Sequence, residues 1–187
     1  MSGLLKHLPN LLTGLRLVSA PAVAFLLMGG DDRAALGLFA FAGLSDAADG
    51  FLAKRFGFAT RFGQYLDPAA DKLLMLASFV TLTILGIAPL WLTAIVIGRD
   101  LAIIAGVILV SLFDLPARVE PLFVGKLSTA CQIAYVALAL VLLSAGLDWP
   151  RWLHVAALAT AFATVVSWAG YGNVLFKALI ARNRQSA

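Results

Sequence analysis

Four aspartates lie close together in the first half of the chain, at spacings that place them on helical faces. Asp46 and Asp49 are three residues apart, and Asp67 and Asp71 are four residues apart. Residues at these spacings project from one side of a helix, so two neighbouring helices would bring the four carboxylates into one pocket. Divalent cations would relieve their mutual repulsion, and ligands with oxygen alone suit Mg²⁺, Mn²⁺ or Ca²⁺. Two such ions about 4 Å apart are typical of displacement at phosphorus.

Single aspartates in this set also have structural interpretations. Asp46 could pair with Arg16 or Arg99, because isolated charges in apolar segments often form such pairs. Asp67 precedes Pro68, and this dipeptide is typical of an N-cap followed by proline at the first helical position. The four aspartates together, at helical spacing, favour a functional site.

The elements that carry these residues are those of a membrane protein. Of the 187 residues, 61% are hydrophobic and only 13% are charged, and the mean hydropathy is +0.95. This composition excludes a soluble enzyme, a disordered chain and a disulfide-rich secreted module. A bilayer-spanning helix uses roughly 20 residues, so we predict one membrane domain, residues 1–187, with six spans. The predicted spans are Leu8–Leu27, Ala34–Ala53, Pro68–Leu85, Leu90–Phe113, Leu122–Gly146 and Trp152–Leu179.

The predicted fold is an all-α integral membrane protein, because only helices satisfy the backbone hydrogen bonds within these spans. We expect a six-helix bundle with a cytoplasm-facing active-site cavity.

Nine of the 14 basic residues fall on one side of the six spans, two on the other and three within them. The positive-inside rule then places both termini and the loop Lys54–Asp67 in the cytoplasm, and Trp91, Trp149 and Trp152 near the outer interface. We expect the protein to be located in a bacterial inner membrane. The nine are Lys6, Lys54, Arg55, Arg61, Arg118, Lys126, Lys177, Arg182 and Arg184, the two are Arg33 and Arg151, and the three are Arg16, Lys72 and Arg99.

At the aspartates the sequence resembles the CDP-alcohol phosphotransferase family, whose signature is D-x2-D-G-x2-A-R-x8-G-x3-D-x3-D. All spacings match, and the one departure is a lysine where the family has arginine. Lysine keeps the charge but loses the planar fork of arginine, and Arg55 next to it could compensate. The resemblance extends over nearly the whole chain and implies a six-span core. The matching residues are Asp46, Asp49, Gly50, Ala53, Gly63, Asp67 and Asp71, with Lys54 at the arginine position.

The resemblance also implies the chemistry, which is transfer of a substituted phosphate from a CDP-linked donor to an alcohol with release of CMP. Carried over by position, Asp46, Asp49, Asp67 and Asp71 would hold two divalent cations, Mg²⁺ or Mn²⁺. Asp71 would also be the catalytic base for the acceptor hydroxyl. The donor site would be lined by Gly50, Ala53 and Gly63, and the basic side chains of Lys54 and Arg61 could hold its diphosphate.

Other segments resemble the branch of the family that uses CDP-diacylglycerol as donor. They include residues 7–16, HLPNLLTGLR, and residues 61–68, RFGQYLDP. Bacterial phosphatidylglycerophosphate synthases are similar over Phe51–Lys72. Eukaryotic-type cardiolipin synthases are similar there and at three further segments, which are Phe39–Asp49, Gly98–Asp100 and Phe123–Gln132.

The acceptor is the point on which the two subfamilies differ. Glycerol-3-phosphate is a phosphomonoester with nearly two negative charges, and its binding site needs several cationic side chains. Phosphatidylglycerol is a diester with one negative charge. The glycerophosphate enzymes tend to show Arg-Glu and a further Arg where this chain has Arg99-Asp100 and then apolar residues. Arg16, Arg99 and Lys126 are the acceptor-binding candidates, Lys72 could join them, and we favour phosphatidylglycerol. Alternatively, Arg99 and Asp100 could form a local ion pair, and the sole role of Lys126 could be to extend its charge to the membrane interface.

Two other classes of protein remain possible on the sequence. A divalent-cation carrier also needs intramembrane aspartates, but carriers usually place them near the midplane of repeated halves. Here they cluster toward one face and no repeat is visible. An inactive scaffold would retain the fold without turnover, and CMP release from CDP-diacylglycerol separates both from an enzyme. The resemblance further implies a homodimer, and no nucleic-acid partner is expected.

Overall fold

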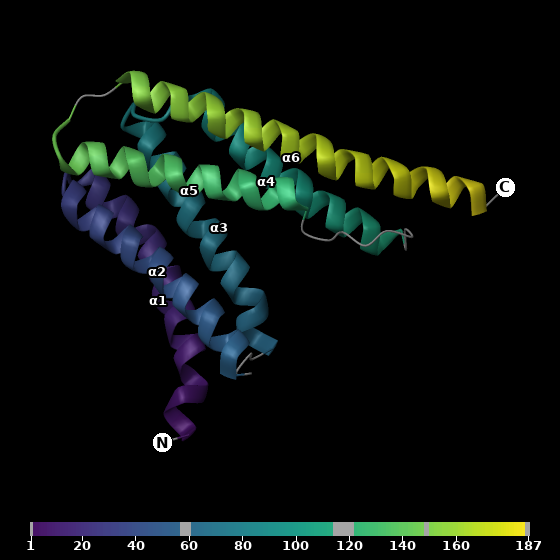
Figure 1. Ribbon diagram of the computed structural model, residues 1–187, viewed down its shortest axis with the longest axis horizontal. Coiled ribbons are helices and arrows are strands. Elements are labelled where there is room, and N and C mark those ends of the chain that lie inside the picture. The colour runs from purple at the N-terminus through teal and green to yellow at the C-terminus, as the bar shows by residue number, and fades with distance from the viewer. Residues whose placement is uncertain (1, 57–60, 114–121, 148–149, 186–187) are drawn as a thin grey trace. The chain divides into compact units, whose positions relative to one another are not determined.

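The protein is all-helical over the residues that its computed structural model describes. The backbone is described for residues 2–56, 61–113, 122–147 and 150–185, and the side chains for 14–45, 68–113, 122–147, 151–178 and 180. Six helices lie in these ranges and confirm the predicted all-α class (Figure 1). They are α1 (Ser2–Met28), α2 (Asp32–Phe56), α3 (Arg61–Ile84), α4 (Leu90–Leu112), α5 (Phe123–Ser144) and α6 (Pro150–Gln185).

The chain divides into two compact units. The first consists of Met1–Ile87 with Val136–Trp149, and the second of Ala88–Tyr135 with Pro150–Ala187. The first unit therefore holds α1, α2, α3 and the end of α5. The second holds α4, the beginning of α5 and α6.

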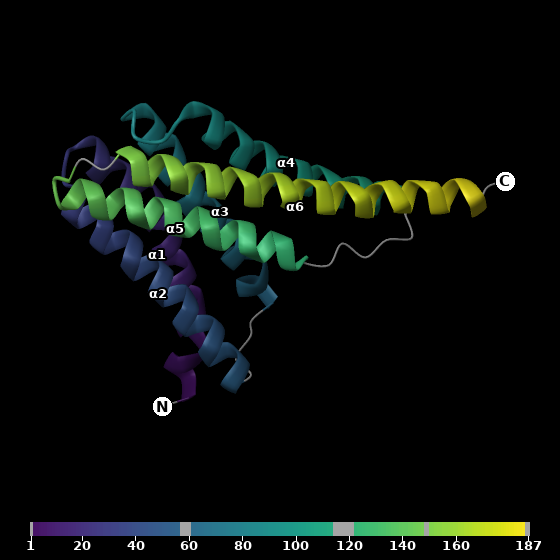
Figure 2. The same ribbon diagram turned by 45° about the horizontal axis from the view of Figure 1, so that its top comes forward.

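Helix α1 is the centre of packing in the first unit, because it packs against both α2 and α3. Figures 1 and 2 show α1 and α2 lying side by side. Many of the buried positions on the three helices are alanines, and small residues let apolar helices approach closely. The buried apolar residues are Ala20, Val23 and Leu27 of α1, Ala35, Phe39 and Ala42 of α2, and Ala70, Leu74, Met75, Phe79 and Leu82 of α3.

Three helices of the first unit end at a glycine in the left-handed conformation. Gly30, Gly86 and Gly146 have φ of 78°, 73° and 62°. At each, the N–H groups of the glycine and of the next residue donate to the carbonyls three and five residues back, over 2.9–3.1 Å. This arrangement is the Schellman motif, which glycine forms without strain. The next helix, α2, begins at once, since Asp31 Oδ1 accepts from the N–H of Ala34 at 3.2 Å as an N-cap.

The second unit is held together by polar contacts as well as apolar ones. Helices α4 and α6 pack against each other and run in the same direction (Figures 1 and 2). Between α5 and α6, Ser128 Oγ lies 3.1 Å from Thr164 Oγ1, and Gln132 Nε2 donates to both hydroxyl oxygens at 3.3 Å. Thr164 in turn donates to the carbonyl of Thr160 at 2.7 Å. These buried hydrogen bonds tie helices together where lipid removes most of the hydrophobic driving force.

Three of the helices are long and apolar enough to cross a bilayer, among the residues that the structure describes. They are Leu90–Leu112, Phe123–Ser144 and Arg151–Ala178. The apolar part of α1 within the same residues, Gly14–Met28, is shorter. The membrane character that we predicted is therefore supported in the second half of the chain, while the count of six spans stays a prediction.

Two predictions about the segment between α2 and α3 are wrong. The expected loop Lys54–Asp67 is largely helical, because α2 continues to Phe56 and α3 begins at Arg61. Asp67 does not begin a helix either, since Pro68 lies inside α3. Hydropathy ends a span at its charged residues, but lysine, arginine and glutamine are good helix formers and the helix continues through them. Proline within α3 removes one backbone hydrogen bond, which a packed membrane helix tolerates.

Candidate functional site

The whole aspartate motif is carried by α2 and α3. Asp46 and Asp49 lie one turn apart on α2, and Asp67 and Asp71 lie one turn apart on α3. Asp71 is the one motif residue whose side chain is described. The side chains of the other predicted site residues of this motif lie outside the described residues: Asp46, Asp49, Gly50, Ala53, Lys54, Arg55, Arg61, Gly63 and Asp67. Convergence of the four carboxylates therefore stays a prediction.

Asp71 forms an ion pair with Arg16, one of the predicted acceptor-binding residues. Arg16 Nη1 of α1 lies 3.0 Å from Asp71 Oδ1 of α3. The two side chains differ sharply in exposure, with 1% of Arg16 and 44% of Asp71 exposed. A guanidinium buried between helices is stable only when it is paired, and here the pair joins α1 to α3. The contact brings together two residues that were predicted separately, one as an acceptor ligand and one as the base.

The environment of Asp71 fits a divalent-cation site as far as it is described. Its carboxylate is a hard oxygen donor, and the large exposed part of the side chain leaves room for a ligand beyond Arg16. The described side chains contain no cluster of three or more His, Cys, Asp or Glu residues that could hold a metal ion. The remaining donors would be the three motif carboxylates whose side chains are not among those described.

Arg99, another predicted acceptor ligand, lies buried in the second unit. Its side chain is 5% exposed, and Nη1 lies 2.7 Å from Oδ1 of the neighbouring Asp100. Nε and Nη2 donate to Ser167 Oγ of α6 at 3.2 and 3.0 Å. Nη2 also lies 3.5 Å from the carbonyl oxygen of Gly125 in α5, and the guanidinium stacks 5.7 Å from the ring centroid of Tyr171. Arg99 therefore links all three helices of this unit, and the local pairing with Asp100 that the sequence left open is present.

Arg99, Asp100, Ser167 and Tyr171 form the Arg99 cluster. The close approach of α5 to the Arg99 cluster depends on a glycine. A Cβ at Gly125 would lie 2.9 Å from the hydroxyl oxygen of Tyr171 and 3.2 Å from Arg99 Nη2. The Tyr171 hydroxyl accepts from the N–H of Leu122 at 3.3 Å, which fixes the start of α5. Lys126, the third predicted acceptor ligand, follows Gly125 and is exposed. The side chain of Lys126 is thus the one accessible cation among the three acceptor candidates.

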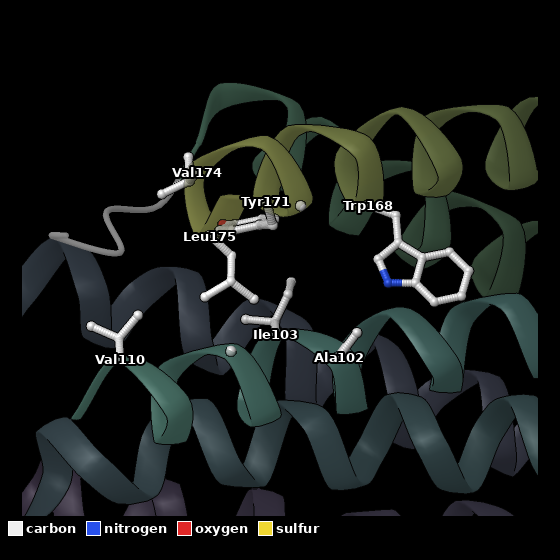
Figure 3. A pocket seen from close by; sticks show the side chains of 9 residues that line it. Ala102, Ile103, Val110, Trp168, Tyr171, Val174 and Leu175 are labelled. Atoms are coloured by element: carbon white, nitrogen blue, oxygen red, sulfur yellow. The ribbon is translucent and has the colours of Figure 1, made fainter. Parts of the chain in front are cut away.

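An apolar cavity of about 120 Å³ lies between α4 and α6. Figure 3 shows side chains of the two helices facing each other across it, with Tyr171 and Trp168 contributed by α6. Gly106 of α4 and Gly172 of α6 line the cavity from opposite sides. A Cβ added at either glycine would meet no atom within 4 Å, so the space beside both glycines is open. Tyr171 connects the cavity to the Arg99 cluster. The other lining residues are Ala102, Ile103, Val110, Val174 and Leu175.

Some members of the Arg99 cluster could not be predicted from the sequence. Ser167 is 68 positions away from Arg99, and no pattern connects serine or tyrosine at that distance to a particular arginine. The segments Gly98–Asp100 and Phe123–Gln132 did carry a signal, because both resemble the same subfamily. The contact of Arg99 with Gly125 gives those two segments a common location in the structure.

Several known proteins are similar to this chain over most of its length. Cardiolipin synthase (CMP-forming) of Rattus norvegicus is 34% identical over 180 residues, which cover 88% of this chain and 60% of that protein. Cardiolipin synthase (CMP-forming) of Streptomyces coelicolor is 35% identical, with 90% of this chain and 77% of that protein covered. A protein of Mycobacterium tuberculosis named "Probable phosphatidylglycerophosphate synthase" is 36% identical, with 87% and 76% covered.

These relatives carry both subfamily names at nearly equal identity, so they do not select an acceptor. The chain also spans less than two thirds of the rat protein. The family itself is clear, because the model of CDP-alcohol phosphatidyltransferase matches residues 6–168, which include the aspartate motif, Arg16 and Arg99. The chain belongs to the CDP-alcohol phosphatidyltransferase family.

Proposed function

We propose that this protein transfers the phosphatidyl group of CDP-diacylglycerol to phosphatidylglycerol, forming cardiolipin and releasing CMP. Family membership and the intact aspartate motif support the reaction type, and they favour an enzyme over a cation carrier or an inactive scaffold. Relatives named cardiolipin synthase support this choice within the family. The relative named for phosphatidylglycerophosphate synthesis keeps glycerol-3-phosphate as the alternative acceptor.

The choice of a diester acceptor rests on one observation. Two of the three candidate cations are buried. Arg16 and Arg99 are almost fully buried, and each is paired with an aspartate. Their charge is therefore largely compensated before any substrate binds. A phosphomonoester needs several available cations, whereas a diester needs fewer. Lys126 is the exposed one among these three, and a site with few accessible cations suits the single charge of phosphatidylglycerol better than the two charges of glycerol-3-phosphate.

In the proposed reaction Asp71 accepts the proton of the acceptor hydroxyl. The hydroxyl oxygen then forms a bond to the phosphorus that carries the diacylglycerol, and the bond from that phosphorus to the bridging oxygen of CMP breaks. CMP leaves with the electron pair. Bound Mg²⁺ or Mn²⁺ would supply charge stabilisation on the diphosphate and on the departing CMP. Their ligands would be Asp46, Asp49, Asp67 and Asp71, and the donor would contact Gly50, Ala53, Lys54, Arg61 and Gly63.

The same proposal places the enzyme in a bacterial inner membrane as a six-helix bundle, with both termini and the active-site cavity on the cytoplasmic side. The bias of basic residues supports this orientation. Trp91 and Trp152 are exposed near the first residues of α4 and α6, as expected for two ends at one bilayer interface. A homodimer is part of the proposal and is supported by the family resemblance alone.

The test is an acceptor comparison in detergent micelles. The purified protein is given CDP-diacylglycerol with Mg²⁺ or Mn²⁺, and then phosphatidylglycerol or glycerol-3-phosphate in separate reactions. We expect CMP and cardiolipin with phosphatidylglycerol, and neither from the variant Asp71→Asn. CMP with phosphatidylglycerophosphate from glycerol-3-phosphate would replace the proposed acceptor by the alternative. No CMP with either acceptor would overturn the proposed function.

A further inference from the structure

The contact between Arg16 and Asp71 suggests a role for Arg16 that differs from acceptor binding. We propose that Arg16 is a positioning residue, which holds the carboxylate of Asp71 in its reactive orientation; this rests on the proposed function of Asp71 as the base. The distance of 3.0 Å between Arg16 Nη1 and Asp71 Oδ1 allows a direct ion pair.

Arg16 belongs to the packed face of α1. The buried residues of this helix include Arg16, Ser19, Ala20 and Val23, at spacings of three, four and seven residues from Arg16, which describe one helical face. With 1% of its side chain exposed, Arg16 offers almost no surface to a soluble or lipid acceptor. A direct acceptor contact would require the guanidinium to leave the packed face, and this would uncover a charge among apolar helices.

Asp71 has the complementary placement, buried on one side and open on the other. Its neighbours Ala70 and Leu74 on α3 are buried, so the backbone at this position is fixed by packing. The carboxylate keeps 44% of the side-chain surface exposed while Oδ1 contacts Arg16. A carboxylate attached to a rigid helix and held by a buried cation is pre-organised for a proton transfer toward its open side.

Replacing Arg16 should therefore affect turnover and not acceptor affinity. In Arg16→Met we expect kcat to fall by about 10²-fold, the loss typical of a displaced catalytic group, with unchanged KM for phosphatidylglycerol and CDP-diacylglycerol. Arg16→Lys should recover much of kcat, because it restores a buried cation beside Asp71. Arg33→Met is the matched control, since Arg33 is an exposed arginine at the start of α2, and its kcat should be unchanged.

Two kinetic results would overturn the proposal. An unchanged kcat in folded Arg16→Met would mean that the pair only stabilises the helix packing. A raised KM for phosphatidylglycerol with an unchanged kcat would return Arg16 to the acceptor site. If Arg16→Met does not fold, Arg16→Gln takes its place in the comparison with Arg16→Lys. Glutamine lacks the charge that pairs with Asp71, so kcat should fall in Arg16→Gln and recover in Arg16→Lys.

A measurement without activity separates this proposal from the proposed function. Melting temperatures of Arg16→Met, Asp71→Asn and the double variant form a double-mutant cycle, and direct contact predicts that the two losses are not additive. Additive losses would show that the pair is absent and would overturn the positioning role. A coupled pair in a wild-type protein that releases no CMP from CDP-diacylglycerol would refute the proposed function, and with it the positioning role that depends on it.

Discussion

Removing the guanidinium of Arg99 should destabilise the second unit strongly, and removing its aspartate partner at the same time should restore most of that stability. The reason is that Asp100 is only 18% exposed and lies 2.7 Å from Arg99 Nη1. In Arg99→Met the carboxylate loses this counter-charge and stays mostly buried. In Arg99→Met/Asp100→Leu neither charge is present, and apolar side chains replace both.

The size of the effect follows from the contacts of Arg99. Breaking a buried ion pair by removing one partner costs about 3–5 kcal/mol, and the partial exposure of Asp100 favours the lower end. The two hydrogen bonds to Ser167 add about 1 kcal/mol together, at roughly 0.6 kcal/mol for each interhelical bond in a membrane protein. Stacking over Tyr171 adds about 0.5–1 kcal/mol. The single variant should therefore lose about 4–5 kcal/mol of unfolding free energy.

The assay is unfolding of the purified protein in detergent, with thermal and denaturant transitions measured for the wild type, both single variants and the double variant. For a chain of this length, a loss of about 4 kcal/mol lowers the melting temperature by roughly 10 °C. Asp100→Asn should lose less, because Arg99 keeps Ser167 and Tyr171. The double variant should lie much closer to the wild type than Arg99→Met does.

The double variant also separates structural and functional roles of Arg99. A double variant as unstable as Arg99→Met would refute the reasoning, since it would mean that the loss of the Arg99 charge beside the Asp100 carboxylate is not the main cause of the instability. A stable double variant with an unchanged KM for phosphatidylglycerol would agree with a purely structural cluster. A stable double variant with a raised KM would show that Arg99 contacts the acceptor despite its burial.

Further predictions concern glycines and the motif. Gly125→Ala should cost about 1–3 kcal/mol of stability through overpacking against Tyr171, whereas Gly106→Ala, whose Cβ meets nothing within 4 Å, should be tolerated in the same unfolding assay. Gly86→Ala should cost about 1–2 kcal/mol, because φ of 73° strains any residue with a Cβ; an unchanged melting temperature would argue against the Schellman motif at the end of α3. Asp71→Asn should lower CMP release by at least about 10²-fold while the protein stays folded. Chelation by EDTA should stop CMP release by the wild type, and added Mn²⁺ should restore it.

Much of the fold could be predicted from the order and spacing of residues along the chain. Apolar runs long enough to span a bilayer located all six helices, since a helix needs only local regularity to be recognised. The boundaries near the motif were less accurate, because hydropathy decreases at Lys54 and Arg55 while helix propensity does not. For the same reason α3 begins at Arg61 and passes through Pro68, which hydropathy alone could not indicate.

Contacts of the buried arginines between helices could not be predicted in this way, although the local pair of Arg99 with Asp100 was among the alternatives that the sequence offered. Spacing within one helix defines which residues share a face, but a contact between helices depends on their relative rotation and axial shift, which no local pattern specifies. Sequence alone therefore leaves acceptor binding and ion pairing open for Arg16 and Arg99, whereas the structure shows burial against Asp71 and Asp100, which compensates most of their charge. That difference matters for function. An acceptor site with two accessible arginines would suit a phosphomonoester, whereas two compensated arginines and an exposed Lys126 suit a substrate with a single negative charge.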